Sequence, residues 1–266
     1  KDRKQDQGLR RHHSHPKGLY SMYSILLSAA AAVAVLLVLL LGFQLSWWLS
    51  LMAGMVVFTA VFVIASRIIM KKVMAALELA GKDLQAQRFE KAIRGMKDAL
   101  RYGPWQLYVS QQINSQIGMA YYIKRDFSNA FPHLEQAFFK NWIAMGMLAI
   151  SYLKRQKRDK MEKTFEKAVQ WNGKESLLWN LYAYCLAEEC NDTAKAKDVL
   201  RRGLKKLPAD PHIIENLDHL ENGRKMKMRS FGDPWYQFHL ESLGQLQNHQ
   251  MAAMGGRMQK RMTVRR

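Results

Sequence analysis

The chain contains 266 residues, of which 48% are hydrophobic, and its formal net charge at pH 7 is +19. This positive charge is spread along the chain without an RNA-binding sheet signature or a helix-turn-helix pattern, so it favours anionic lipid headgroups over nucleic acid as a partner. The two cysteines, Cys185 and Cys190, do not have the spacing of a zinc knuckle or a redox pair, and the reducing compartment predicted below argues against a structural disulfide. We expect them to be buried thiols.

A long uncharged stretch near the N-terminus predicts a membrane anchor. No charged residue lies between Lys17 and Arg67, a run of 49 positions. One crossing needs about 20 apolar residues, and a single helix of this length would far exceed the bilayer core. A polar break around Gln44, followed by two tryptophans of the kind found at membrane interfaces, divides the run. The pattern predicts a transmembrane hairpin over residues 20–69, with helices at about Tyr20–Gly42 and Trp47–Ile69.

The residues that flank this hairpin predict its orientation. Residues 1–19 form a basic arm, Arg67, Lys71 and Lys72 accompany the end of the second helix, and the connecting loop has neither Lys nor Arg. Positive flanks stay in the cytoplasm, so both termini are expected there. The arm also contains a short histidine tract (His12, His13 and His15), which we interpret as part of a charged terminal arm and not as a metal site.

Residues 70–222 have the periodicity of successive amphipathic helices, because apolar residues recur at spacings of three and four. A longer pattern is superposed on it: a small residue, a large residue four positions later, and a small residue three positions after that. Copies of this pattern occur at Ala92–Met96–Ala99, Ala130–Leu134–Ala137 and Ala196–Leu200–Gly203, and a weaker copy, with a methionine at its first position, occurs at Met161–Phe165–Ala168. An earlier helix with its own signature precedes each copy, marked by Leu79–Ala80, Ile117–Gly118, Leu148–Ala149 and Trp179.

This double signature resembles the tetratricopeptide repeat (TPR), a helix pair of about 34 residues. The spacings between copies are 38, 31 and 35 residues, and the fourth copy needs one extra residue in its turn, near Asn191 and Asp192. The resemblance implies an all-α protein: a transmembrane hairpin, then an α-solenoid of about four TPR-like pairs, with a capping helix around His212–Leu220. A generic helical bundle is the alternative.

The resemblance also implies that the domain binds proteins and does not catalyse a reaction. The sequence contains no phosphate loop, nucleophile elbow or metal-spaced histidine pair, so we expect no enzyme activity, no cofactor and no metal. Partners are expected to be other proteins of a membrane complex, held in a groove formed by the first helix of each pair. The predicted groove residues are Asn114, Tyr121, Tyr122, Tyr152, Asn180 and Tyr184.

Residues 223–266 form a basic tail that contains methionines and an aromatic cluster. Four aromatic residues fall within eight positions: Phe231, Trp235, Tyr236 and Phe238. They are too apolar for a purely solvated tail. Either they fold back onto the repeats or they dock on a partner, and the sequence leaves both possibilities open.

These observations favour a membrane-anchored cytoplasmic scaffold that helps to assemble a membrane complex. The alternative is a structural, accessory subunit whose hairpin packs inside a larger complex, since small residues such as Gly54 permit close helix contact in lipid. The layout is similar to a scaffold subunit of a bacterial exopolysaccharide synthesis and export machine, and to a membrane protein encoded beside haem-biosynthesis enzymes. This layout implies a bacterial inner membrane.

Overall fold

The computed structural model describes residues 23–42 and 46–240, and every regular element in these ranges is helical. Tyr20, Gln44, the arm of residues 1–19 and the methionine-containing end of the tail lie outside the described residues. The chain divides into two compact units, Lys1–Lys71 with Tyr102–Leu107 and Lys72–Arg101 with Tyr108–Arg266. Each unit is described by itself.

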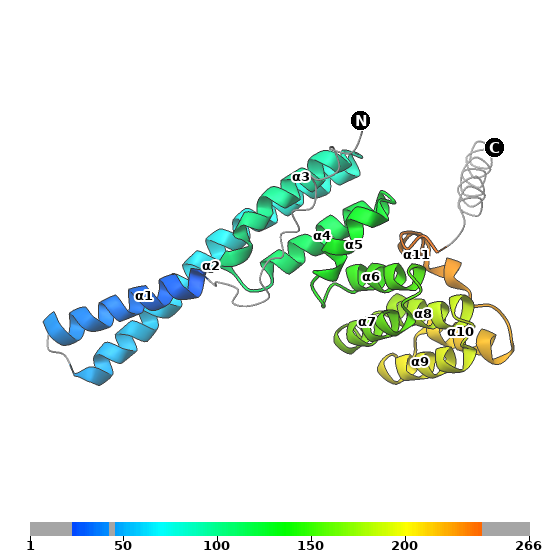
Figure 1. Cartoon of the computed structure of the whole chain (residues 1–266). Helices are drawn as coiled ribbons and strands as arrows, with labels where there is room; N and C mark the ends of the chain where they lie inside the picture. Colours follow the sequence, from blue (N-terminus) through cyan, green and yellow to red (C-terminus); the bar gives the residue numbers. More distant parts are fainter. Residues whose placement is uncertain (1–22, 43–45, 241–266) are drawn as a thin grey trace, which may run out of the picture. The chain divides into compact units, whose positions relative to one another are not determined.

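The first unit contains two helices that are long and apolar enough, by length and composition, to cross a membrane. Helix α1 (Tyr23–Leu37) continues through a π-helical turn, η1 (Val38–Gly42), and α2 begins at Trp47 (Figure 1). A Cβ atom placed on Gly54 of α2 would lie 3.4 Å from the carbonyl oxygen of Ala32, so the small residue lets the two helices meet closely.

Helix α2 spans Trp47–Gln85, which is longer than the predicted Trp47–Ile69. At 1.5 Å per residue it measures about 58 Å, against about 30 Å for a hydrocarbon core. Nothing interrupts the helix at Ile69, because the next residues include strong helix formers such as Ala75, Leu77 and Ala80 and no proline. The boundary predicted at residue 70 therefore falls inside a helix.

In the second unit, consecutive helices pack in pairs, α4 with α5, α6 with α7, and α8 with α9 (Figure 1). The elements are α3 (Phe89–Ala99), η2 (Leu100–Trp105, mostly in the first unit), α4 (Val109–Ile123), α5 (Phe127–Glu135), α6 (Trp142–Lys154), α7 (Arg158–Trp171), α8 (Ser176–Tyr184), η3 (Cys185–Glu189), α9 (Thr193–Lys206), α10 (Pro211–Glu221), η4 (Met228–Phe231) and α11 (Asp233–Tyr236).

The turn inside each pair has the same construction. One non-glycine residue with positive φ lies in the turn after α2 and in the turn inside each of the three pairs, at Gln87, Arg125, Gln156 and Asn191. These positions are 38, 31 and 35 residues apart, the same intervals that separate the copies of the sequence pattern. The backbone therefore repeats with the irregular spacing predicted from the side chains.

The extra residue of the fourth copy is accommodated by a π-helical turn. In the second and third copies, the amide after the positive-φ residue donates to a carbonyl five residues earlier, as from Asp126 to Tyr121 at 2.9 Å. In the fourth copy Asp192 donates to Leu186, six residues earlier, at 2.8 Å. The π-helical segment Cys185–Glu189 comes directly before this turn and takes up the difference.

Small residues occupy the close contacts of this unit. A Cβ atom on Gly118 would lie 2.8 Å from Cδ2 of Leu134, and one on Gly203 would lie 3.0 Å from Cγ of Trp179. Ala92, Ala130 and Ala196 start three of the pattern copies and are fully buried, as is Met161, which starts the other copy. Ala137 differs, because α5 ends at Glu135 and this residue lies half-buried in the following turn.

Candidate partner-binding surfaces

The six predicted groove residues do not form an open surface. Asn114, Tyr121, Tyr122, Tyr152 and Asn180 are buried, and Tyr184 is half-buried. Three of these side chains bond to α3 or α5. Tyr121 Oη accepts from Lys97 Nζ of α3 at 2.9 Å. Tyr152 Oη donates to Glu135 Oε1 of α5 at 2.9 Å, and Asn114 Oδ1 lies 2.8 Å from His133 Nδ1 of α5. Tyr122 and Tyr184 contact a segment from the C-terminal part of the chain, and Asn180 bonds to Asn216 of α10.

That segment, residues 226–239, is here called the C-terminal segment. Its apolar side chains are buried against the helices: Met226 is 7% exposed, Met228 3%, Trp235 1% and Phe238 0%. Phe231 and Tyr236 are half-buried, and the Phe231 ring lies 4.2 Å from that of His212. The aromatic cluster thus folds back onto its own chain.

Trp235 and Phe238 contact the first helices of the pairs. The Trp235 ring meets Tyr184 of α8 edge-on, with centroids 4.9 Å apart. The Phe238 ring lies against α6, where a Cβ atom on Gly146 would be 3.1 Å from its Cε1. Tyr122 of α4 donates its hydroxyl to the carbonyl of Phe238 at 2.9 Å. One short aromatic segment therefore joins α4, α6 and α8, and we call the surface it covers the α4/α6/α8 surface.

A buried amide pair fixes the beginning of the C-terminal segment. Asn216 of α10 is 1% exposed; its Nδ2 donates to Asn180 Oδ1 at 2.8 Å, and its Oδ1 accepts from the amide of Lys227 at 2.6 Å. The amide of Met226 donates to Glu188 Oε1 at 3.2 Å. Asn180, predicted to contact a partner, therefore supports the chain's own segment through Asn216.

Burial changes the acid–base behaviour of groups beneath this segment. It raises the pKa of Tyr122, so the phenol stays protonated and can donate to Phe238. Burial, and secondarily the charge of Arg125, lowers the pKa of His239, whose ring stacks on Tyr122 with centroids 5.7 Å apart. This buried, stacked position therefore favours the neutral form of the His239 imidazole.

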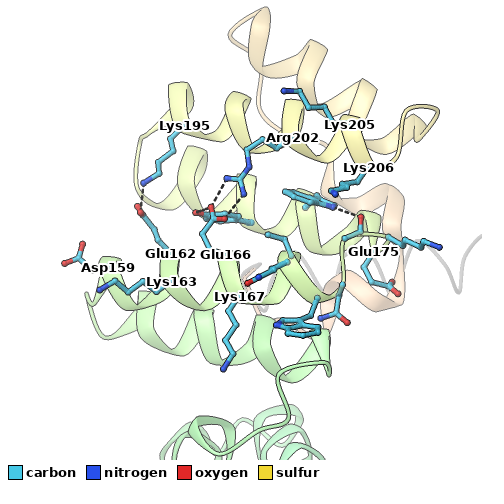
Figure 2. Close-up of a pocket in the computed structure, with 18 residues that line it drawn as sticks. Asp159, Glu162, Lys163, Glu166, Lys167, Glu175, Lys195, Arg202, Lys205 and Lys206 are labelled. Atoms are coloured by element: carbon cyan, nitrogen blue, oxygen red, sulfur yellow. Dashed lines mark hydrogen bonds and ion pairs between the residues drawn. The ribbon is translucent and has the colours of Figure 1, made fainter.

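A second surface in the same unit is open. A cavity of about 1280 Å³ is lined by α7, the turn after it, α8 and α9 (Figure 2). We call it the basic pocket, because seven of its lining residues are Lys or Arg and four are Asp or Glu. The sequence analysis missed it, since its residues come from three helices. The available signal was the lysines spaced along α7 and the lysine pair at the end of α9.

Part of this charge is already neutralised. Arg202 donates to both carboxylate oxygens of Glu166, at 2.8 and 2.6 Å, and lowers the pKa of that carboxyl group. Lys195 Nζ lies 2.5 Å from Glu162 Oε2. The remaining lysines of the pocket are exposed and make no ion pair with any described residue: Lys163, Lys167, Lys174, Lys205 and Lys206.

The described residues hold no group of three or more His, Cys, Asp or Glu side chains arranged to bind a metal ion. Cys185 is buried and Cys190 half-buried, and both are free thiols. Burial raises the pKa of Cys185 well above its usual value, so this thiol is a packing residue and not a reactive nucleophile.

No protein-family model matches this chain, and no curated protein matches its sequence. The resemblance to tetratricopeptide repeats therefore rests on the residue pattern.

Proposed function

We propose that this protein is a non-enzymatic, membrane-anchored scaffold. In this proposal α1 and α2 cross a bacterial inner membrane, both termini are cytoplasmic, and the paired helices are TPR-like repeats that hold proteins of a membrane complex. Two observations support it: the pair of helices suited to crossing a membrane, and the turn that recurs after α2, α4, α6 and η3.

One observation carries the binding part of the proposal: the α4/α6/α8 surface already holds an extended aromatic segment. Trp235 and Phe238 are buried there to 1% and 0% exposure, although they follow the last helix of the pairs in sequence. Aromatic anchors in close-packed sites contribute much of the affinity in protein interfaces. We infer that a partner would present a similar segment, with two aromatic side chains three residues apart, in place of the C-terminal segment.

A cleavable version of the full-length protein tests this inference. A protease site placed between Arg224 and Lys225, both exposed, would separate the C-terminal segment from α10 without touching Trp235 or Phe238. After cleavage, a labelled synthetic peptide of residues 225–240 should exchange onto the protein. The uncleaved protein should bind much less peptide, because the attached segment competes at a high effective concentration.

The matched control is the same peptide with both aromatics replaced, as in Trp235→Ala and Phe238→Ala. This peptide should not exchange. A cleaved protein that neither releases its segment nor binds the labelled peptide would show that the segment is a fixed part of the fold, and would remove the binding part of the proposal.

Orientation is tested separately by thiol labelling in intact cells, with both native cysteines replaced. Cysteine introduced at Gln44 should react with an impermeant reagent from outside, whereas cysteine at Gln112 should react only after lysis. Outside labelling of Gln112 would reverse the proposed topology.

The rival proposal is a structural subunit whose hairpin packs inside a larger complex, and small residues in the hairpin were one argument for it. Gly54 lies against Ala32 and Leu36 of the same chain, so this glycine already has a use within the hairpin.

A further inference from the structure

We propose that the basic pocket binds the phosphate group of anionic lipid headgroups, which goes beyond the binding of partner proteins. The five lysines without an ion pair to a described residue come from two helices and a turn. Lys163 and Lys167 belong to α7, and Lys205 and Lys206 belong to α9 (Figure 2). Lys174 belongs to the turn after α7. The unpaired acidic residues of the lining, Asp159 and Glu175, are outnumbered, so the groups free to meet a ligand carry a net positive charge.

The types of side chain favour phosphate over a peptide carboxylate. Planar, bidentate recognition of carboxylates is best made by arginine, whereas lysine binds phosphate as a point charge. The one arginine in the lining, Arg202, already uses both amino groups on Glu166. The cationic groups left to bind a ligand are all lysines.

Aromatic residues beside the lysines favour a lipid as the source of the phosphate. Trp171 lines the pocket and is 52% exposed, and its ring lies 4.9 Å from Phe139 and 5.2 Å from the Lys140 ammonium. An exposed tryptophan among lysines is the combination that sits at the headgroup level of a bilayer. The chain also carries two helices suited to crossing a membrane, which would tether it to a lipid bilayer.

The test uses the full-length protein in an uncharged detergent. Calorimetric titration with dioctanoyl phosphatidylglycerol should show saturable binding, while dioctanoyl phosphatidylcholine should bind far more weakly. The double variant Lys163→Gln/Lys206→Gln removes one lysine from each of two helices and should weaken phosphatidylglycerol binding by roughly 30-fold. The charge-matched control Lys197→Gln/Lys225→Gln changes two lysines that lie outside the pocket lining and should bind as the wild type does.

Two further arms distinguish the possible sources of negative charge. Inorganic phosphate should bind much more weakly than phosphatidylglycerol, and an oligoglutamate peptide should not compete with the lipid. Hydrogen exchange of residues 163–175 in the wild type should slow when phosphatidylglycerol is added, which locates the site independently of any variant. Equal losses in the pocket and control variants, equal affinity for inorganic phosphate, competition by oligoglutamate, or unchanged exchange in residues 163–175 would each overturn the proposal.

Discussion

The two candidate surfaces of the helical unit differ in what covers them. The α4/α6/α8 surface is lined by Tyr122, Gly146 and Tyr184 and is closed by the chain's own Trp235 and Phe238. The basic pocket is lined largely by charged side chains and is open. A large apolar surface is unfavourable in water, whereas lysines are well solvated. The chain therefore covers its apolar α4/α6/α8 surface and leaves the basic pocket exposed to water. Exposure of a surface alone does not identify it as a binding site.

The largest expected effect follows from replacing the two buried aromatic side chains of the C-terminal segment. Trp235→Ala and Phe238→Ala should each lower the free energy of unfolding by about 3–5 kcal/mol, because both side chains are fully buried. Urea unfolding of the full-length protein followed by circular dichroism measures this loss. Pro234→Ala, at an exposed neighbour, is the control and should change stability by less than about 1 kcal/mol. Small losses for both aromatic variants would mean that the surface is not closed in solution.

A smaller loss is expected from overpacking between the paired helices beneath that surface. Gly118→Leu should cost about 1–3 kcal/mol, because its Cβ would lie 2.8 Å from Leu134. Gly95→Leu is the matched control, since a Cβ at Gly95 of α3 meets no atom within 4 Å. If thermal unfolding responds equally to both substitutions, the assigned contact between α4 and α5 is wrong.

The closed surface should also depend on pH through His239. Its folded pKa is lowered, mainly by burial, so the neutral ring's contribution is fully present above the ordinary histidine pKa of about 6.5 and is lost as pH falls through the folded value. The urea midpoint should therefore drop between pH 7.5 and pH 5. His133 has a pKa lowered for the same reason and contributes in the same direction. His239→Gln should reduce the drop without abolishing it, and an identical pH profile would contradict the assignment to His239.

The smallest effect on stability is expected in the basic pocket. Lys163→Gln/Lys206→Gln should change the free energy of unfolding by less than about 0.5 kcal/mol, because both side chains are exposed and neither is in an ion pair. A loss as large as that of Trp235→Ala would show that these lysines support the fold, and the contrast between the two surfaces would disappear.

Hydrophobic periodicity was sufficient to predict that residues 70–222 are built of successive helices. The pattern copies and the positive-φ turns share the same spacings because the small residues and the turns belong to one repeating unit. The continuation of α2 to Gln85 was missed, because the change from apolar to charged residues at Arg67 was read as an end. Polarity changes there, but helix propensity does not.

The surfaces were harder to predict than the helices. Tyr122 and Tyr184 were predicted to contact a partner protein, but in the structure they contact the chain's own Phe238 and Trp235. The sequence could not separate the two cases, because aromatic burial is the same in both. Tyr121 and Tyr152 were assigned to the same surface, yet their side chains bond to Lys97 and Glu135. A helix-pair signature identifies the face of a helix poorly when both faces are buried.

A double-mutant cycle between Tyr184 and Trp235 tests the central claim most directly. These rings meet edge-on in the structure and are 51 positions apart in sequence, so energetic coupling between them requires the C-terminal segment to lie on α8. Unfolding free energies of Tyr184→Ala, Trp235→Ala and the double variant should show a coupling of about 0.5–1.5 kcal/mol. The control cycle between Tyr152 and Trp235 should be additive. Additive losses for Tyr184 and Trp235 as well would contradict the closed surface.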